Sequence, residues 1–227
     1  LEARVRTATS LDRSACALFV DVAPAGAAIV ERARAFDADL IVLGVAAGTP
    51  AESVDGVALD VIRHAPCSVL VAREQQLGGP VLIAVDLGKS STTVVRTGAE
   101  LARALGRDAV VTHVAHVDSP DIVVALTAFF SGSLPPQPDV EAVLALAKAA
   151  LEAEVAAAGL EAEARVVRGD PKHVVLEQGQ VLEAATIVVG STAHPTLARL
   201  GLGSVAETVV QKSAASVLVV RPPRSPA

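Results

Sequence analysis

The chain has 227 residues, of which 52% are hydrophobic and only 2% aromatic, and its formal net charge is −6. This length allows one large domain or two small ones with a buried core, and the shortage of aromatic side chains favours small aliphatic groups layered on a parallel sheet and excludes an aromatic cofactor cage. The negative charge excludes a general nucleic-acid-binding protein, because contact with a phosphate backbone needs a strongly basic face.

The first third of the chain predicts alternating strands and helices. Short apolar runs rich in β-branched residues indicate strands, and Pro24 stands where a proline opens a helix. The apolar stripe of that helix includes Ile29, Val30, Ala33 and Phe36. In order, the predicted elements are strand 17–22, helix 24–36, strand 40–43, helix 54–64 and strand 68–72.

The same alternation continues after Gln75–Pro80, a polar connection containing glycine. Apolar periodicity, helix-opening residues and closing glycines give the boundaries. The predicted elements are strand 81–85, a helix to 105, strand 109–117, helix 139–158, strand 164–168, a helix from 171, strand 184–189, helix 205–212 and strand 216–220.

The two parts of the chain are copies of one repeat. Gly44 corresponds to Gly190, and Val69–Val71 corresponds to Val217–Val219, with a spacing two residues shorter in the first copy. The repeated order of strand and helix predicts an α/β fold with a doubly wound parallel sheet. The first copy has no counterpart of Val81–Val140, so it is incomplete or the visible chain begins inside a domain.

We therefore predict a first domain at 1–75, a linker at 76–80, a second domain at 81–222 and a disordered tail at 223–227. The chain contains no methionine, so Leu1 is not expected to be the translation start.

Gly190–Val205 has the pattern of an anion-binding loop. It follows a buried strand that ends at Gly190, and Gly203 and Ser204 precede the next helix. A glycine loop between a strand and a helix start offers free backbone N–H groups and the positive end of a helix dipole to an anion. This stretch therefore predicts a phosphate site.

The same loop resembles that of the universal stress protein family, written G-x2-G-x9-G-[ST] in its nucleotide-binding members. Gly190, Ala193 and Gly203-Ser204 occupy the pattern, with Ala193 in place of the second glycine. The resemblance extends to Leu197, Arg199 and the closing strand. It implies a Rossmann-like fold and a site for ATP or AMP, with Mg²⁺ accompanying the phosphates. It also implies that the last strands of the two copies, 68–72 and 216–220, pair edge to edge within the chain and make a pseudo-dimer.

The resemblance also assigns parts of the nucleotide to residues. Phosphates would lie at the loop and at Val205, the ribose at Asp86, beside Ala84, and the adenine at the backbone of Val114. Asp86 has an alternative interpretation, as a cap or Asx turn for the helix that follows. In the first copy Asp55-Gly56 stands in place of Gly203-Ser204, and a carboxylate there would repel phosphate.

Two classes of function remain open. One is a stress-response regulator that binds an adenine nucleotide in its second domain; the other is an interaction or dimerisation protein of the same family without nucleotide. The sequence contains no Walker lysine, G-x-S-x-G elbow or set of metal ligands, so no enzyme is predicted beyond slow ATP hydrolysis.

The remaining features indicate a reduced, cytoplasmic protein. Cys16 and Cys67 have no CxxC neighbour, and the five histidines have no metal-ligand spacing. No apolar run is long enough to span a membrane, so neither a membrane nor a nucleic acid is expected as partner. The apolar stretch 122–130 is either a lid or subunit contact, or a plain helix within the domain, so a homo-oligomer is expected to use it or the final strands.

Overall fold

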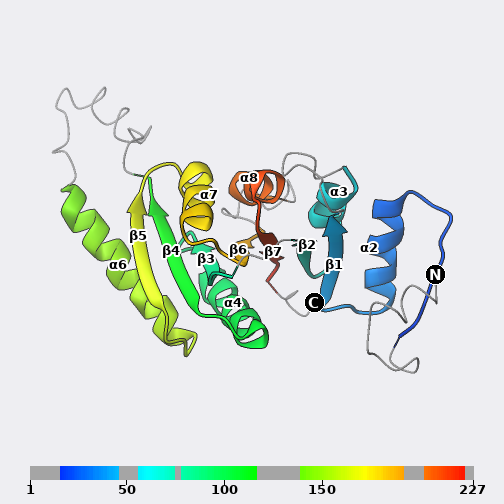
Figure 1. Ribbon diagram of the computed structural model, residues 1–227, viewed down its shortest axis with the longest axis horizontal. Coiled ribbons are helices and arrows are strands. Elements are labelled where there is room, and N and C mark those ends of the chain that lie inside the picture. The colour runs from blue at the N-terminus through cyan, green and yellow to red at the C-terminus, as the bar shows by residue number, and fades with distance from the viewer. Residues whose placement is uncertain (1–15, 46–55, 75–77, 117–138, 192–201, 223–227) are drawn as a thin grey trace.

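The computed structural model describes residues 16–45, 56–74, 78–116, 139–191 and 202–222, which form one seven-stranded sheet with helices on both faces (Figure 1). The strand order is β1-β2-β7-β6-β3-β4-β5. The strands are β1 Leu40–Val45, β2 Ser68–Arg73, β3 Val81–Val85, β4 Ala109–Ala115, β5 Glu163–Arg168, β6 Thr186–Gly190 and β7 Ser216–Val220. The helices are α2 Ala25–Ala35, α3 Gly56–His64, α4 Ser91–Leu105, α6 Val140–Ala157, α7 Pro171–Val181 and α8 Ser204–Lys212.

The predicted doubly wound α/β fold is confirmed. In the second copy the chain runs outward from β3 to β4 and β5, and then returns to β6 and β7 on the other side of β3. The order of strands therefore reverses between β3 and β6. In open α/β sheets, ligands bind at the carboxyl ends of the strands beside such a reversal.

The final strands of the two copies pair as predicted. β2 and β7 are antiparallel, with Leu70 opposite Leu218 at the centre of the pairing, whereas all other neighbours in the sheet are parallel. This pairing joins the two copies into one continuous sheet and covers an edge of each.

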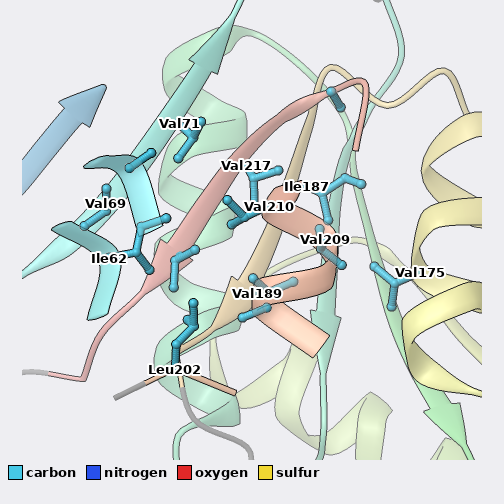
Figure 2. Packing of buried hydrophobic residues seen from close by; sticks show 14 of the residues in the cluster. Ile62, Val69, Val71, Val175, Ile187, Val189, Leu202, Val209, Val210 and Val217 are labelled. Carbon is cyan, nitrogen blue, oxygen red and sulfur yellow. The ribbon is translucent and has the colours of Figure 1, made fainter. Parts of the chain in front are cut away.

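Two apolar layers hold the sheet between the helices. The larger core lies on the face covered by α2, α3, α7 and α8, and the smaller lies under α4 and α6. Figure 2 shows Val209 and Val210 of α8 beside Val189 and Val217 of the strands. These α8 side chains are fully buried, so packing fixes the helix that begins at the predicted anion loop.

The prediction of a strand at 17–22 is wrong, because these residues form no strand. In the second copy the corresponding strand, β5, pairs with β4, whereas none of the described strands of the first copy lies beside 17–22 in this way. A strand without a neighbour leaves its backbone N–H and C=O groups unpaired. A high local β propensity is therefore not enough to form a strand. Accordingly, the side chain of Val22 is fully exposed, and Phe36, which was expected in the apolar stripe of α2, is 55% exposed.

One face of β1 is also less covered than the same face of β6, its counterpart in the second copy. The ladders give Ile41 opposite Val69 in the first copy and Ile187 opposite Val217 in the second, so Val42 and Val188 are equivalent positions. Val188 is fully buried and belongs to the core under α4 and α6, whereas Val42 is 58% exposed. In the second copy α4 contacts β6, and the first copy has no such helix among its described residues.

Candidate functional site

A cavity of about 350 Å³ opens at the carboxyl ends of β3, β4 and β6, at the reversal of strand order. Six of the eight residues predicted from the sequence line it: Ala84, Asp86, Val114, Gly190, Gly203 and Val205. The size lies within the range of small-molecule sites, roughly 300–1,000 Å³. The fold thus brings together residues that are far apart in the sequence.

The structure does not place the other two predicted site residues, Ser204 and Ala193, on this wall, for different reasons. Ser204 is the first residue of α8, and its exposed side chain is not among those that line the cavity. Ala193 lies outside the described residues, as do Leu197 and Arg199. For these residues the binding role remains a prediction.

Asp86 forms a turn with the residues that follow it, and it also lines the cavity. Its Oδ1 accepts hydrogen bonds from Gly88 N at 2.9 Å and from Ser91 Oγ at 3.2 Å, which is the Asx turn of the alternative interpretation. The residue also lines the cavity, and Oδ2 makes no hydrogen bond with any described residue. The carboxylate is therefore held by one oxygen while the other can accept a hydroxyl donor.

The ends of the predicted anion loop are joined. Gly203 N donates to Ser191 O at 2.8 Å, and Ser191 N donates to Val220 O at 2.9 Å. The chain thus returns beside the end of β6, and α8 begins there with Gly203 as its N-cap and no side chain capping it. Uncapped N–H groups at a helix start favour an anion.

The sequence did not identify the wall contributed by α4 and α7. Ser91 and Val94 of α4 and Pro171 and Val175 of α7 also line the cavity. None of them belongs to a motif, and a local pattern does not show which helix residues reach a strand end. The apolar stripe of α4 was the available signal, because its buried face must lie against the sheet.

His113 of β4 and His116, directly after this strand, both line the cavity. His113 Nδ1 lies 2.9 Å from Val85 O, and His116 Nδ1 lies 3.3 Å from Gly169 O. Each ring is thus bonded to a backbone carbonyl. In the described part of the chain no group of three or more His, Cys, Asp or Glu residues is placed to hold a metal ion.

The arrangement suits a ligand with three chemical parts. Ala84, Val114 and Val175 give an apolar wall for a flat ring, Asp86 gives an acceptor for hydroxyls, and the start of α8 favours a negative group. No lysine or arginine is among the described residues that line the cavity, so on this part of the wall backbone dipoles are what favours an anion.

Fold and site together define an α/β protein with a ligand cavity at the switch point of a doubly wound sheet. The sequence model described as the universal stress protein family matches residues 2–73 and 79–221. The chain belongs to this family, and the match falls in two segments that contain the two copies of the repeat.

Solved structures show the same fold. A functionally unknown protein from Pseudomonas aeruginosa PAO1 has a TM-score of 0.63 and 21% identity, with 89% of this chain and 69% of that chain covered. A universal stress protein from Archaeoglobus fulgidus DSM 4304 has a TM-score of 0.56 and 18% identity, with 86% of this chain and 64% of that chain covered. The chain thus spans about two thirds of each of these proteins.

A search of curated protein sequences gives no match. Among the residues that the structure describes, no helix is long and apolar enough to cross a membrane. The segment 122–130, the tail 223–227 and Asp55 lie outside the described residues.

Proposed function

We propose that the protein is a stress-response regulator that binds an adenine nucleotide, ATP or AMP, in the cavity of its second domain. The supporting observation is the convergence of six residues, chosen from a sequence pattern, on one cavity at the strand reversal. The adenine would lie on the apolar wall at Ala84 and Val114, and the ribose hydroxyls would donate to Asp86.

The phosphates would lie at Gly190, Gly203 and Val205, next to the start of α8, with Ala193 and Ser204 completing the loop. The cavity has a carboxylate at one side and a helix N-terminus at another, which matches the polarity of a nucleoside phosphate. Mg²⁺ would accompany the phosphates of ATP, bound by phosphate oxygens and water. Binding would act by shifting a conformational or oligomeric equilibrium, and not by a chemical step.

The first copy, 1–75, would serve as a structural partner of the second, 81–222. Its loop has Asp55-Gly56 in place of Gly203-Ser204. In addition, no described strand flanks β1 on the side where β3 flanks β6. One nucleotide per chain is therefore the expected stoichiometry.

Calorimetric titration with ATP and AMP tests the proposal. Ala84→Leu should abolish binding, because its larger side chain would occupy the cavity wall. The matched control is Ala109→Leu, at the amino end of β4 and away from the cavity, which should leave binding intact. A flat titration of the wild type at millimolar ligand would contradict the proposal.

The alternative is an interaction protein of the same family that has lost its nucleotide, and Ala193 in place of glycine favours it. Substitution Ala193→Gly separates the two. Binding by the variant but not by the wild type would establish the alternative. Slow ATP hydrolysis would require phosphate release by the wild type above that of Ser204→Ala.

A further inference from the structure

The loop after β3 is held in an unusual backbone conformation. Leu87 has a φ of 58°, in the left-handed region that side-chain-bearing residues rarely adopt. Asp86 Oδ1 stabilises the turn through Gly88 N and through Ser91 Oγ, and Ser91 is only 1% exposed. A side chain at Gly88 would place its Cβ 3.0 Å from Asp86 Oδ1. The direction of the Asp86 carboxylate is therefore set by this loop.

His113 fixes the beginning of the same loop. It lies opposite Val85 in the β3–β4 ladder, and its Nδ1 is 2.9 Å from Val85 O. A backbone carbonyl only accepts, so Nδ1 carries the proton and donates it. The carbonyl of Val85 shares a planar peptide unit with the nitrogen of Asp86. A hydrogen bond to that carbonyl thus fixes the peptide plane from which Asp86 leaves the sheet.

We propose that His113 is a positioning residue for Asp86: it orients the carboxylate toward the ribose hydroxyls of a bound nucleotide. This inference depends on the proposed function, since it names a residue that supports Asp86 within the same nucleotide site. The ligands that Asp86, positioned by His113, would recognise are nucleotides with free 2′- and 3′-hydroxyls. His113 acts through the backbone, so its contribution should require the hydroxyls that Asp86 accepts.

The test compares two ligands, ATP and 2′,3′-dideoxy-ATP, which lacks both hydroxyls. His113→Phe keeps a ring of similar shape but removes the donor, and His113→Asn keeps a donor at the same number of bonds from the backbone. We expect His113→Phe to weaken ATP binding by about tenfold, the equivalent of one hydrogen bond of about 1.4 kcal/mol. His113→Asn should recover most of that loss, and dideoxy-ATP should bind both variants as it binds the wild type.

Two further variants keep the test decisive. His113→Gln moves its amide one bond further out, so it should behave as His113→Phe does, including when the phenylalanine variant folds poorly. His116→Phe removes the other cavity-lining ring, which bonds Gly169 and not the Asp86 loop. Its effect should be the same for both ligands, since it does not act through the hydroxyls.

Three outcomes are distinguishable. Unchanged ATP affinity in both His113→Phe and His113→Gln would overturn the inference. Equal losses of ATP and dideoxy-ATP would also overturn it, because His113 would then contact the ligand elsewhere or only stabilise the fold. If the wild type binds neither ATP nor AMP, the proposed function itself fails, whatever the variants do.

Discussion

Arg73 and Arg221 make equivalent hydrogen bonds across the junction of the two copies, each from its own copy to the other. Arg73 N donates to Ser216 Oγ at 3.1 Å, and its guanidinium Nη2 donates to Val210 O in the last turn of α8 at 3.1 Å. Arg221 N donates to Ser68 Oγ at 3.1 Å, and its Nη2 donates to Ile62 O in the last turn of α3 at 2.7 Å. Each copy thus stabilises a helix end of the other.

This reciprocity follows from the antiparallel pairing of β2 and β7. Each arginine ends or follows its own strand, and antiparallel pairing places it beside the serine that begins the other strand. The last carbonyls of a helix have no partner within the helix and carry its negative partial charge, so a guanidinium there is favourable. The junction is held by charge-assisted bonds as well as by the strand ladder.

Replacement of either arginine by alanine should destabilise the fold. We expect Arg73→Ala and Arg221→Ala each to lower the free energy of unfolding by about 1–2 kcal/mol, since a charge-assisted hydrogen bond to a helix end is lost. Urea denaturation measures the change. Arg96→Ala, at an exposed position of α4, should leave stability unchanged. Equal midpoints for all four proteins would show that the junction contacts contribute nothing.

The equivalent valines of the two copies should respond differently to a charge. Val188→Lys places an ammonium in the core under α4 and should cost about 3 kcal/mol or more. Val42→Lys should change stability by less than about 0.5 kcal/mol, because the side chain is already exposed. Both variants can be compared by urea denaturation of the whole chain. A large loss for Val42→Lys would mean that this face of β1 is covered in solution.

The sequence predicted those elements whose signal is local. β3 and β7 have the predicted bounds. The pairing of the final strands was implied by the family resemblance, and the β2–β7 ladder confirms it. A short apolar run with β-branched residues identifies a buried strand when neighbours are present. At 17–22 the same signal failed, because no strand among the described residues of the first copy offers the pairing that β4 gives to β5.

For the site, the strand ends and the start of α8 could be predicted from the sequence, whereas the supporting residues could not. Glycine and aspartate after a strand are recognisable because their chemistry is tied to a fixed backbone position. Val175 and Ser91 reach the cavity only through the packing of α7 and α4 on the sheet. The bond from His113 to Val85 depends on the β3–β4 register, which strand periodicity alone does not determine.

A close approach of α4 to β3 gives a further prediction. A Cβ built at Gly98 would lie 2.6 Å from Cδ1 and 2.7 Å from Cγ1 of Ile83, which is fully buried. Gly98→Ala should therefore lower the free energy of unfolding by about 1 kcal/mol, since overpacking outweighs the gain in helix propensity. Gly56→Ala, with no atom within 4 Å of its Cβ, should not destabilise.

A double-mutant cycle separates the overlap from other causes. Ile83→Val removes the atom nearest to the new Cβ, so Gly98→Ala should cost less in that background than in the wild type. Denaturation of the two single variants and the double variant supplies the coupling energy. Strictly additive losses would contradict the proposed contact between Gly98 and Ile83.

The thiol of Cys67 should react slowly near neutral pH. Its pKa is raised from the ordinary value of a cysteine, first by burial and then by the negative charge of Asp39, while Arg221 acts in the opposite direction. Alkylation follows the thiolate, so the rate should reach half its maximum only above the ordinary thiol pKa. Iodoacetamide labelling of a Cys16→Ser variant across pH measures Cys67 alone.

Asp39 and Arg221 shift the pKa of Cys67 in opposite directions, so the electrostatic explanation can be tested with a variant of each. Asp39→Asn removes the negative charge, so the pKa should fall and labelling at about pH 8 should accelerate; Arg221→Ala should raise the pKa and slow it. Asp37→Asn removes a carboxylate two residues from Asp39 in the sequence that is not among the causes of this shift, so it should leave the rate unchanged. Because the Arg221 guanidinium also bonds the end of α3, slower labelling of Arg221→Ala together with lower stability would place both effects at the junction of the two copies. Faster labelling of that variant would instead mean that loss of the junction exposes Cys67 to solvent, and the electrostatic explanation would be wrong.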